Sequence, residues 1–541
     1  MYSLRNPAFI LSRDLPLSPV TPSNYCTSAK GAFDDTTPAQ MRDAFSQYKS
    51  VSGSKSLALF FHGGLVDKKS GMANAQQLLG PYSAANAASG FAGNAYPYFF
   101  VWESGLIETL QHNLLGIASE AIFQRLRDII GGKSQSVIGG TSPQSPALLR
   151  TPTLNVTTRA VPPNLTLSSA DIEEVQCAVE NDPIINVERQ KIARSSISVR
   201  DAFAQPRDGL TREVRTSAVT LLSPEIVSAI VAEEEHRAAV VPTNKSLLWN
   251  PVSLGTLALG AGKVLIRIIS RYASGHNHNF HNTVVEEIFR QYYIANIGWA
   301  VWNEMKVETA EAFQGTTESN VGTALIANLI DLYESNPACL NARITLLGHS
   351  TGAIYICNFL RAIDAALVGK TYKDQIGFDV IFMAPAVRVD VLSQTIASYG
   401  NRIRNFRAFE MSDPLESSEI LVQLDGAMGS AVNPLLAEIY TSSLLYFISG
   451  VLEDDDDDTP IDGMQRFFLG TRPFTPGSVK AVDEIKTFLA RFPNPVIYSD
   501  TAGMTPQPPP GHTCTSHHHG GFPSDKGTLE SVCYLLRTGS Y

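Results

Sequence analysis

Short apolar runs alternate with helix-like segments in two separate parts of this 541-residue chain. In the first part, Ser56–Phe61 and Tyr96–Trp102 are predicted to be buried strands, and Gly71–Leu79 between them is predicted to be helical. Strands that alternate with helices in this way are typical of parallel sheets with helical crossovers. We therefore expect an α/β domain with a mostly parallel, doubly wound sheet.

The same alternation resumes toward the end of the chain. The predicted strands there are Arg343–Leu347, Phe378–Met383, Ile403–Met411 and Pro495–Tyr498. The predicted helices are Gly322–Tyr333, Thr351–Leu367, Val389–Ala397, Val479–Ala490 and Gly527–Leu536. This order is the one that a doubly wound sheet requires.

The middle of the chain has a different character. Gly131–Ala170 is dense in Gly, Ser, Thr and Pro and is predicted to be loop or linker. Asp171–Val240 carries charged patterns with helical periodicity, and Val284–Met305 is predicted to be one amphipathic helix. The middle is therefore expected to be a mainly helical insertion.

These patterns divide the chain into three segments. Residues 1–115 and 311–541 are expected to build the sheet domain, and residues 116–310 the insertion or lid. The first fifty residues, rich in Pro, Ser and Thr, are expected to wrap the domain as irregular chain.

Charge and targeting signals narrow the class of protein. The formal charge of −10 argues against nucleic-acid binding, which needs clustered Lys and Arg. The start of the chain has no apolar signal-peptide core, and the six cysteines show no framework spacing. The apolar stretch Leu247–Ile269 is too interrupted to predict a membrane span. A cytoplasmic protein with reduced thiols is the expectation.

One motif joins a predicted strand to a predicted helix. Gly348-His349-Ser350-Thr351-Gly352 has the form G-x-S-x-G, with ITLL before it and AIYICNFLRAI after it. Glycines relieve the crowding of a tight strand-to-helix turn, and the serine hydroxyl then projects at the helix N-terminus. The pentapeptide alone arises by chance, but these flanks supply the context that predicts a nucleophilic Ser350.

With this motif the sequence resembles the α/β-hydrolase superfamily, and within it the lipases and esterases whose turn reads G-H-S-x-G. The resemblance covers about residues 55–115 and 320–541 and leaves out the middle insertion. It implies an α/β-hydrolase fold and a triad in the order Ser, acid, His.

The resemblance also assigns an oxyanion loop. His62-Gly63-Gly64-Leu65 follows the first predicted strand, where the family places a loop that supplies one amide to the developing oxyanion. The amide of Gly64 or Leu65 would act there together with that of Thr351.

The acid is expected just after the strand that ends at Met411. There the chain reads Ser412-Asp413-Pro414, and the resemblance implies that Asp413 orients the histidine. Glu410 and Glu416 are weaker candidates, and Asp390 would be in an atypical position.

Three adjacent histidines follow the last predicted strand. The resemblance favours His519, because it precedes a small-residue and aromatic turn; alignment on Ser516 would favour His517. His518 is not distinguished from either by spacing alone.

Metal binding is the rival interpretation of these histidines, together with His276, His278 and His281. No cysteine or carboxylate shows the fixed spacing of a zinc site, so neither a metal nor another cofactor is expected. The acidic run from Glu453 to Asp458 lacks the pattern of a calcium loop and is predicted to be a solvated surface loop.

Lys263, Arg267 and Arg271 are spaced to share one face of a helix. A solvated helix face is the favoured interpretation; a lid over an apolar acyl pocket, with peripheral contact to an anionic membrane, is the hypothesis set against it.

Together these features predict a serine hydrolase that cleaves carboxylic esters, with a lipid-like ester as the expected small-molecule substrate. A peptidase, thioesterase or acyltransferase with the same triad is the alternative among enzymes. A non-catalytic binding protein on a hydrolase scaffold is the alternative of another class. The oligomeric state is left open.

Overall fold

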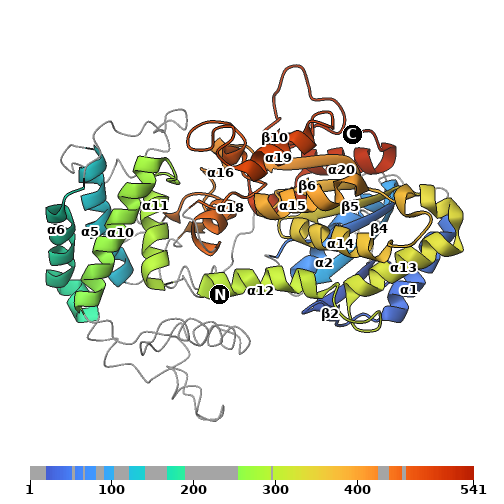
Figure 1. Ribbon diagram of the computed structural model, residues 1–541, viewed down its shortest axis with the longest axis horizontal. Helices are drawn as coiled ribbons and strands as arrows, with labels where there is room; N and C mark the ends of the chain where they lie inside the picture. Colours follow the sequence, from blue (N-terminus) through green and yellow to red (C-terminus); the bar gives the residue numbers. More distant parts are fainter. Residues whose placement is uncertain are drawn as a thin grey trace, which may run out of the picture.

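An eight-stranded sheet lies at one end of the molecule, in the strand order β10-β7-β6-β5-β3-β4-β1-β2 (Figure 1). The computed structural model describes residues 20–51, 55–64, 68–80, 90–102, 121–139, 167–188, 254–293, 297–423, 438–453 and 458–541. Neighbouring strands of this sheet pair in parallel except β1 and β2, which are antiparallel. The expected α/β architecture with a mostly parallel sheet is confirmed.

The sheet takes its strands from both ends of the sequence. They are β1 (Tyr25–Ala29), β2 (Ala32–Phe33), β3 (Leu57–Phe61), β4 (Tyr96–Trp102), β5 (Ile344–His349), β6 (Phe378–Met383), β7 (Ile403–Met411) and β10 (Val496–Ser499). A separate antiparallel pair is formed by β8 (Val422–Gln423) and β9 (Glu438–Tyr440). The six strands expected from apolar runs are all present, and β5 extends to His349, next to the G-x-S-x-G serine.

Helices cover both faces of the sheet. They are α1 (Pro38–Val51), α2 (Lys68–Leu79), α3 (Phe91–Asn94), α13 (Val321–Ser335), α14 (Gly352–Ala366), α15 (Val389–Tyr399), α19 (Lys480–Leu489) and α20 (Lys526–Thr538). One core contains side chains of α1, α13, α14, α15 and α19, and the other contains those of α2, α3 and α20. The strand β3 is fully buried because its side chains alternate between these two cores. Leu57, Leu59 and Phe61 lie in the first core, and Ala58 and Phe60 lie in the second.

The remaining elements are short or lie between β4 and α13. The longer helices are α5 (Ala121–Gly139), α6 (Ser169–Asn181), α10 (Leu254–Ser274), α11 (Phe280–Ile288) and α12 (Ile297–Glu311). The short ones are α16 (Asp413–Glu416), α18 (Leu444–Phe447), η6 (Phe289–Tyr293), η7 (Pro337–Asn341), η8 (Lys373–Gln375), η9 (Gly400–Arg402), η11 (Ile448–Leu452), η12 (Gln465–Phe467) and η13 (His519–Ser524).

The sequence analysis expected irregular chain over the first fifty residues, and this expectation is wrong for residues 20–50. From residue 20 they contain β1, β2 and α1. Met41, Ala44, Phe45 and Tyr48 share one face of α1 and are buried in the core. The polar residues around this stripe masked its helical period.

Two expectations for the middle segment are also wrong. Gly131–Gly139 is the second half of α5 and not loop, because Ile130, Gly131 and Ser134 are buried on one side of it. The single helix expected over Val284–Met305 is two helices, α11 and α12. Figure 1 shows α5, α6, α10 and α11 grouped at the end of the molecule away from the sheet, with α12 running toward it. No described helix is both long and apolar enough to cross a bilayer.

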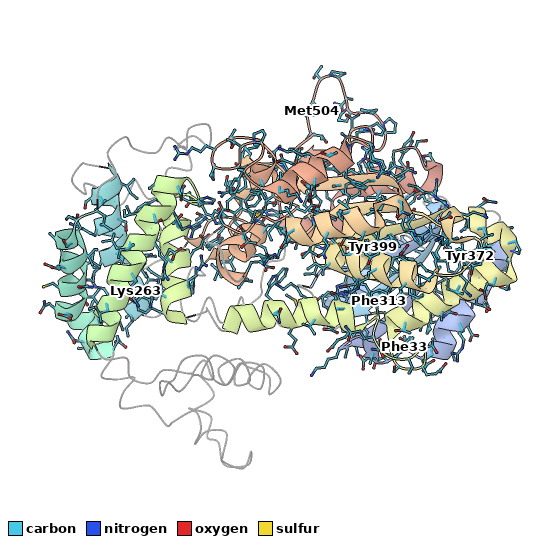
Figure 2. All side chains as sticks on the ribbon, in the orientation of Figure 1. Phe33, Lys263, Phe313, Tyr372, Tyr399 and Met504 are labelled. Atoms are coloured by element: carbon cyan, nitrogen blue, oxygen red, sulfur yellow. The ribbon has the colours of Figure 1, made fainter. Side chains whose placement is uncertain are left out.

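The basic stripe of α10 has three different environments. Lys263 is exposed (Figure 2), Arg267 is partly buried, and Arg271 is 1% exposed. Arg271 Nη2 lies 2.7 Å from Glu286 Oε2, and its Nη1 lies 3.0 Å from Glu287 Oε1. A solvated stripe is therefore wrong for Arg271, which neutralises two buried carboxylates of α11.

The ion pairs continue from α11 to the sheet domain. His278 has Glu286 Oε1 at 2.8 Å from Nδ1 and Asp458 Oδ1 at 2.8 Å from Nε2, and Arg466 Nη2 lies 2.5 Å from Asp458 Oδ2. Asp458 ends the acidic run that was predicted to be a solvated loop, yet it is buried, as is Glu453 at the other end. Both carboxylates have cationic partners, and this outweighs their mutual repulsion.

We predict that Arg271→Met lowers the free energy of unfolding by about 3–5 kcal/mol, because it leaves buried carboxylates without their counter-charge. Denaturant unfolding followed by circular dichroism measures the change. Lys263→Met on the exposed side of the same helix is the matched control and should unfold at the wild-type midpoint. Equal midpoints for the two variants would contradict the prediction.

Candidate active site

The turn that contains Ser350 joins β5 to α14 in a strained conformation. Ser350 has φ of +54°, in the left-handed region that non-glycine residues rarely adopt. Its amide donates to Met383 O at 3.0 Å, and its carbonyl accepts from Ala386 N at 3.0 Å. These two hydrogen bonds to the segment after β6 hold the strained backbone in place.

Glycine is required after this turn by close packing. A Cβ added to Gly352 would lie 2.2 Å from the carbonyl oxygen of Phe61 on β3. The first turn of α14 therefore packs directly on the backbone of the neighbouring strand. The serine is fixed at the helix N-terminus, where the helix dipole favours negative charge.

The structure brings His519 to Ser350. His519 Nε2 lies 3.0 Å from Ser350 Oγ, and the two residues are each 1% exposed. Burial lowers the pKa of His519 well below its ordinary value, and His349 nearby lowers it further. The imidazole is therefore neutral at pH 7 and can accept the proton of the serine hydroxyl.

Both backbone polar groups of His519 are held by side chains, those of the half-buried Glu419 and the buried His349. The Glu419 carboxylate accepts from His519 N at 3.1 and 3.2 Å, and His349 Nε2 donates to His519 O at 3.0 Å. Burial raises the pKa of Glu419 to about 7 and lowers that of His349 to about 4. Sequence analysis gave neither residue this role; the only signal for Glu419 was its place after β7 at the same spacing that separates Asp413 and Glu416.

The other two histidines do not reach the serine. His517 is exposed, with Nε2 2.8 Å from Asp500 Oδ2, and His518 is exposed near Glu419. Of the three adjacent histidines, His519 is the one that the structure brings to within hydrogen-bond distance of Ser350.

The expected acid, Asp413, forms no hydrogen bond with the imidazole of His519. Asp413 is buried, accepts a hydrogen bond from Tyr446 OH at 2.5 Å, and donates its amide to Gln465 Oε1 at 2.9 Å. His519 Nδ1 is buried and has no hydrogen-bond partner in the described part of the chain. The expected hydrogen bond between Asp413 and His519 is therefore not formed in this structure.

The weaker acid candidates lie elsewhere. Glu416 is buried and hydrogen-bonded by the Ser443 hydroxyl. Asp390 is exposed and paired with Arg388. Glu410 lines a cavity between β7, β10 and α19.

The glycines of the His62-Gly63-Gly64 segment lie against the serine turn. A Cβ on Gly63 would be 3.0 Å from the Ser350 Cβ, and one on Gly64 would be 2.8 Å from Thr351 Oγ1 and 2.7 Å from Met305 Sδ. Among the described residues, neither the Gly64 nor the Thr351 amide donates a hydrogen bond. Leu65, the other expected amide donor, lies outside the described residues.

His62 orders this segment. Its Nε2 accepts from the Trp102 amide at 3.0 Å, so its Nδ1 donates to Gly63 O at 2.6 Å. Trp102 Nε1 in turn donates to His62 O at 3.1 Å. Burial lowers the pKa of His62 to about 4, which keeps this neutral tautomer at pH 7.

Among the described residues, no group of three or more His, Cys, Asp or Glu side chains is placed so that it could hold a metal ion. His278, one of the histidines considered as a ligand, is instead paired with Glu286 and Asp458. The six cysteines are free thiols, five of them buried.

The arrangement defines a class of site: a buried serine–histidine pair at a strand-to-helix turn, with two backbone amides beside it. Comparison of the chain with protein-family models, with curated proteins and with solved structures finds no match. The chemistry is therefore argued from the site itself.

We predict that Gly352→Ala destabilises the protein by about 3 kcal/mol or prevents folding, because its methyl group would overlap the Phe61 carbonyl. Gly520→Ala, adjacent to His519, is the matched control, since a Cβ there meets nothing within 4 Å. Thermal unfolding of the two variants measures the difference, and a wild-type transition for Gly352→Ala would show that the contact is not rigid.

Proposed function

We propose that the protein is a serine hydrolase of the α/β-hydrolase type that cleaves carboxylic esters. The observation that carries the proposal is the 3.0 Å contact between Ser350 Oγ and His519 Nε2 at a left-handed strand-to-helix turn. A serine hydroxyl is a weak nucleophile until a positioned base takes its proton, and this contact is the geometry that transfer needs.

The proposed reaction has two steps. His519 takes the proton of Ser350 while Oγ attacks the ester carbonyl carbon, and His519 then protonates the departing alcohol as the C–O bond breaks. Water, deprotonated by His519, attacks the acyl-enzyme, and Ser350 leaves with that proton. The acid is released, and both residues return to their starting states.

The amides of Gly64 and Thr351 are the proposed oxyanion donors. Their residues are adjacent in space, and the amides donate no hydrogen bond among the described residues. Two such donors beside a nucleophile stabilise the tetrahedral intermediate, and loss of one commonly costs about 10²–10³-fold in rate. The N-terminus of α14 adds to the same field.

An apolar acyl group is the substrate class that the surroundings favour. Met305 on α12 and the Thr351 side chain both lie against Gly64, so a thioether forms part of the wall beside the proposed oxyanion donors. We propose a lipid-like ester because the flexible thioether of Met305 can contact an apolar acyl chain.

We predict that a fluorophosphonate probe labels the wild-type protein and that Ser350→Ala abolishes both labelling and hydrolysis of p-nitrophenyl esters. His519→Ala should lower both at least 10³-fold, because it removes the base. His517→Ala is the matched control and should retain wild-type rates, since that ring pairs with Asp500.

Other outcomes of this assay separate the alternatives. Unlabelled wild-type protein would support a non-catalytic binding protein. Labelling with faster turnover of amides or thioesters than of esters of any chain length would replace the esterase by a peptidase or thioesterase, and transfer to an added alcohol would indicate an acyltransferase.

Asp413 is the proposed orienting acid in the substrate-bound state, and Glu419 the residue that positions the backbone of His519. We predict that Asp413→Asn lowers kcat about 10³–10⁴-fold on an ester substrate, because the imidazolium formed during attack loses its carboxylate. Glu419→Gln keeps an oxygen that can accept from His519 N and should lower kcat less than about tenfold. The opposite ranking would give Glu419 the role of the acid.

A further inference from the structure

A cavity of about 330 Å³ lies between β7, β10 and α19, on the sheet face that α15 and α19 cover. It is separated from the serine site, since β7 lies two strands away from β5 in the sheet. Its walls are mainly apolar and aromatic, with Phe406, Phe468, Phe492 and Val496 among them. Ala490, which follows α19 directly, is one of its lining residues and is exposed. This size is within the range of small-molecule sites.

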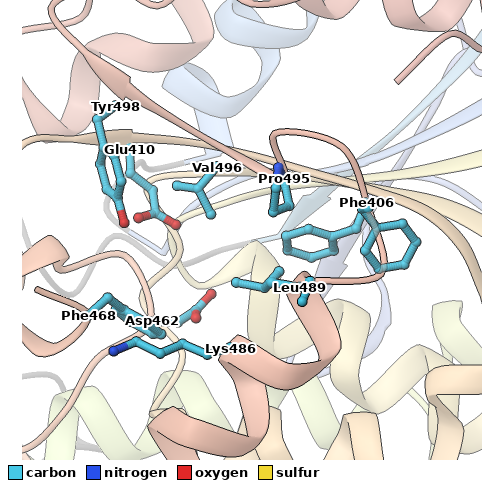
Figure 3. Close-up of a pocket in the computed structure, with 11 residues that line it drawn as sticks. Phe406, Glu410, Asp462, Phe468, Lys486, Leu489, Pro495, Val496 and Tyr498 are labelled. Atoms are coloured by element: carbon cyan, nitrogen blue, oxygen red, sulfur yellow. The ribbon is translucent and has the colours of Figure 1, made fainter. Parts of the chain in front are cut away.

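Two buried carboxyl groups face this apolar space. Glu410 is 3% exposed and Asp462 is 4% exposed, and Figure 3 shows both turned into the cavity. Glu410 Oε2 is buried without a hydrogen-bond partner among the described residues. An unpartnered carboxyl oxygen in an apolar wall is costly unless something fills the space beside it.

The charged and titratable residues that line the cavity are Glu410, Asp462, Lys486 and Tyr498. Burial raises the pKa of Glu410 well above its ordinary value, and Asp462 and Glu416 raise it further. Burial raises the pKa of Asp462 to about 7. Tyr498 on β10 stays neutral because burial and these two carboxyls raise its pKa, and Lys486 on α19 is the one cation among the lining residues. Without a ligand, burial therefore favours the protonated form of Glu410, and Asp462 changes its charge near neutral pH.

The chemistry of the walls narrows the class of ligand. An anion would face two carboxyl groups, and a neutral apolar molecule would leave Glu410 Oε2 without a donor. A metal ion would need at least three strong ligands, and no such group occurs in the described part of the chain. A positive group with several N–H donors satisfies the carboxyls, and aromatic faces beside it add cation–π attraction.

We propose that this cavity binds a small organic cation, a primary ammonium group carried on an apolar chain. The ammonium donates to Glu410 and Asp462, and the chain lies against Phe406, Leu489 and Val496. The site is independent of ester cleavage and goes beyond the proposed function.

Isothermal titration calorimetry of the full chain with hexylammonium chloride tests the proposal. Binding converts protonated carboxyls to carboxylates, so the affinity should rise at least tenfold between pH 6 and pH 8. Proton release should appear as a difference in heat between buffers of different ionisation enthalpy. 1-Hexanol, of the same length without the charge, should bind at least tenfold more weakly at pH 8.

Four variants locate the site. Glu410→Gln and Asp462→Asn should each weaken hexylammonium binding at least tenfold at pH 8, and both remove a buried ionisable group, so we expect them to fold. Glu484→Gln on α19 loses the same charge outside the cavity and should bind as wild type does. Ala490→Trp adds a large side chain at an exposed lining residue, and it should abolish binding without changing the thermal transition.

The proposal is overturned if hexylammonium does not bind at millimolar concentration, or if 1-hexanol binds equally well. It is also overturned if calcium chloride displaces hexylammonium, or if folded Glu410→Gln and Ala490→Trp proteins bind like wild type. None of these results depends on esterase activity, so failure of this site and failure of the proposed function are distinguishable.

Discussion

The left-handed backbone at Ser350 is the constraint on which the site depends. It is held by hydrogen bonds to Met383 and Ala386 and by the packing of Gly352 on the Phe61 carbonyl. The strain costs about 1–3 kcal/mol, which the surrounding sheet must supply. The Ser350 hydroxyl lies at the end of β5, and Gly63 and Gly64, which follow the neighbouring strand β3, lie beside it. The backbone at the centre of the sheet therefore fixes the position of the Ser350 hydroxyl.

The sequence predicted six of the eight strands of this sheet and missed β1, β2 and the helix α1. Runs such as Leu57–Phe61 and Phe378–Met383 are buried on both faces and leave no period to misread. The helix α1 was missed because its four buried residues lie among polar ones. Ser350 was singled out by a motif and its flanks, whereas His519 was favoured over His517 only through the family resemblance. The spatial partners Glu419 and His349 could not be found, since nothing in local periodicity states which backbone group a distant side chain will bind.

Charge patterns were the least informative part of the sequence. Arg271 and Asp458 look like residues of solvated faces when only their neighbours in the chain are considered. Folding instead buries both, and His278 and Arg466 pair with Asp458. These contacts join α10 and α11 to the C-terminal part of the chain, where Tyr446 also donates a hydrogen bond to Asp413. A buried network of this kind stabilises the fold only when all its members are paired, because a buried charge without a partner is strongly unfavourable. The insertion is thus connected to the sheet domain by electrostatics as well as by apolar packing.

Ser350 and His519 are 169 residues apart in the sequence, and Gly63 and Gly64 come from a third distant region. Closing such separations loses chain entropy before any contact compensates for it, so pairings of this kind tend to form slowly. A chain with its helices formed but its strand order incomplete would lack the serine–histidine pair. During refolding, covalent labelling of Ser350 by an electrophile would therefore report when the native strand order has formed. Spectroscopic signals of helix content would rise earlier, before the strand order is complete.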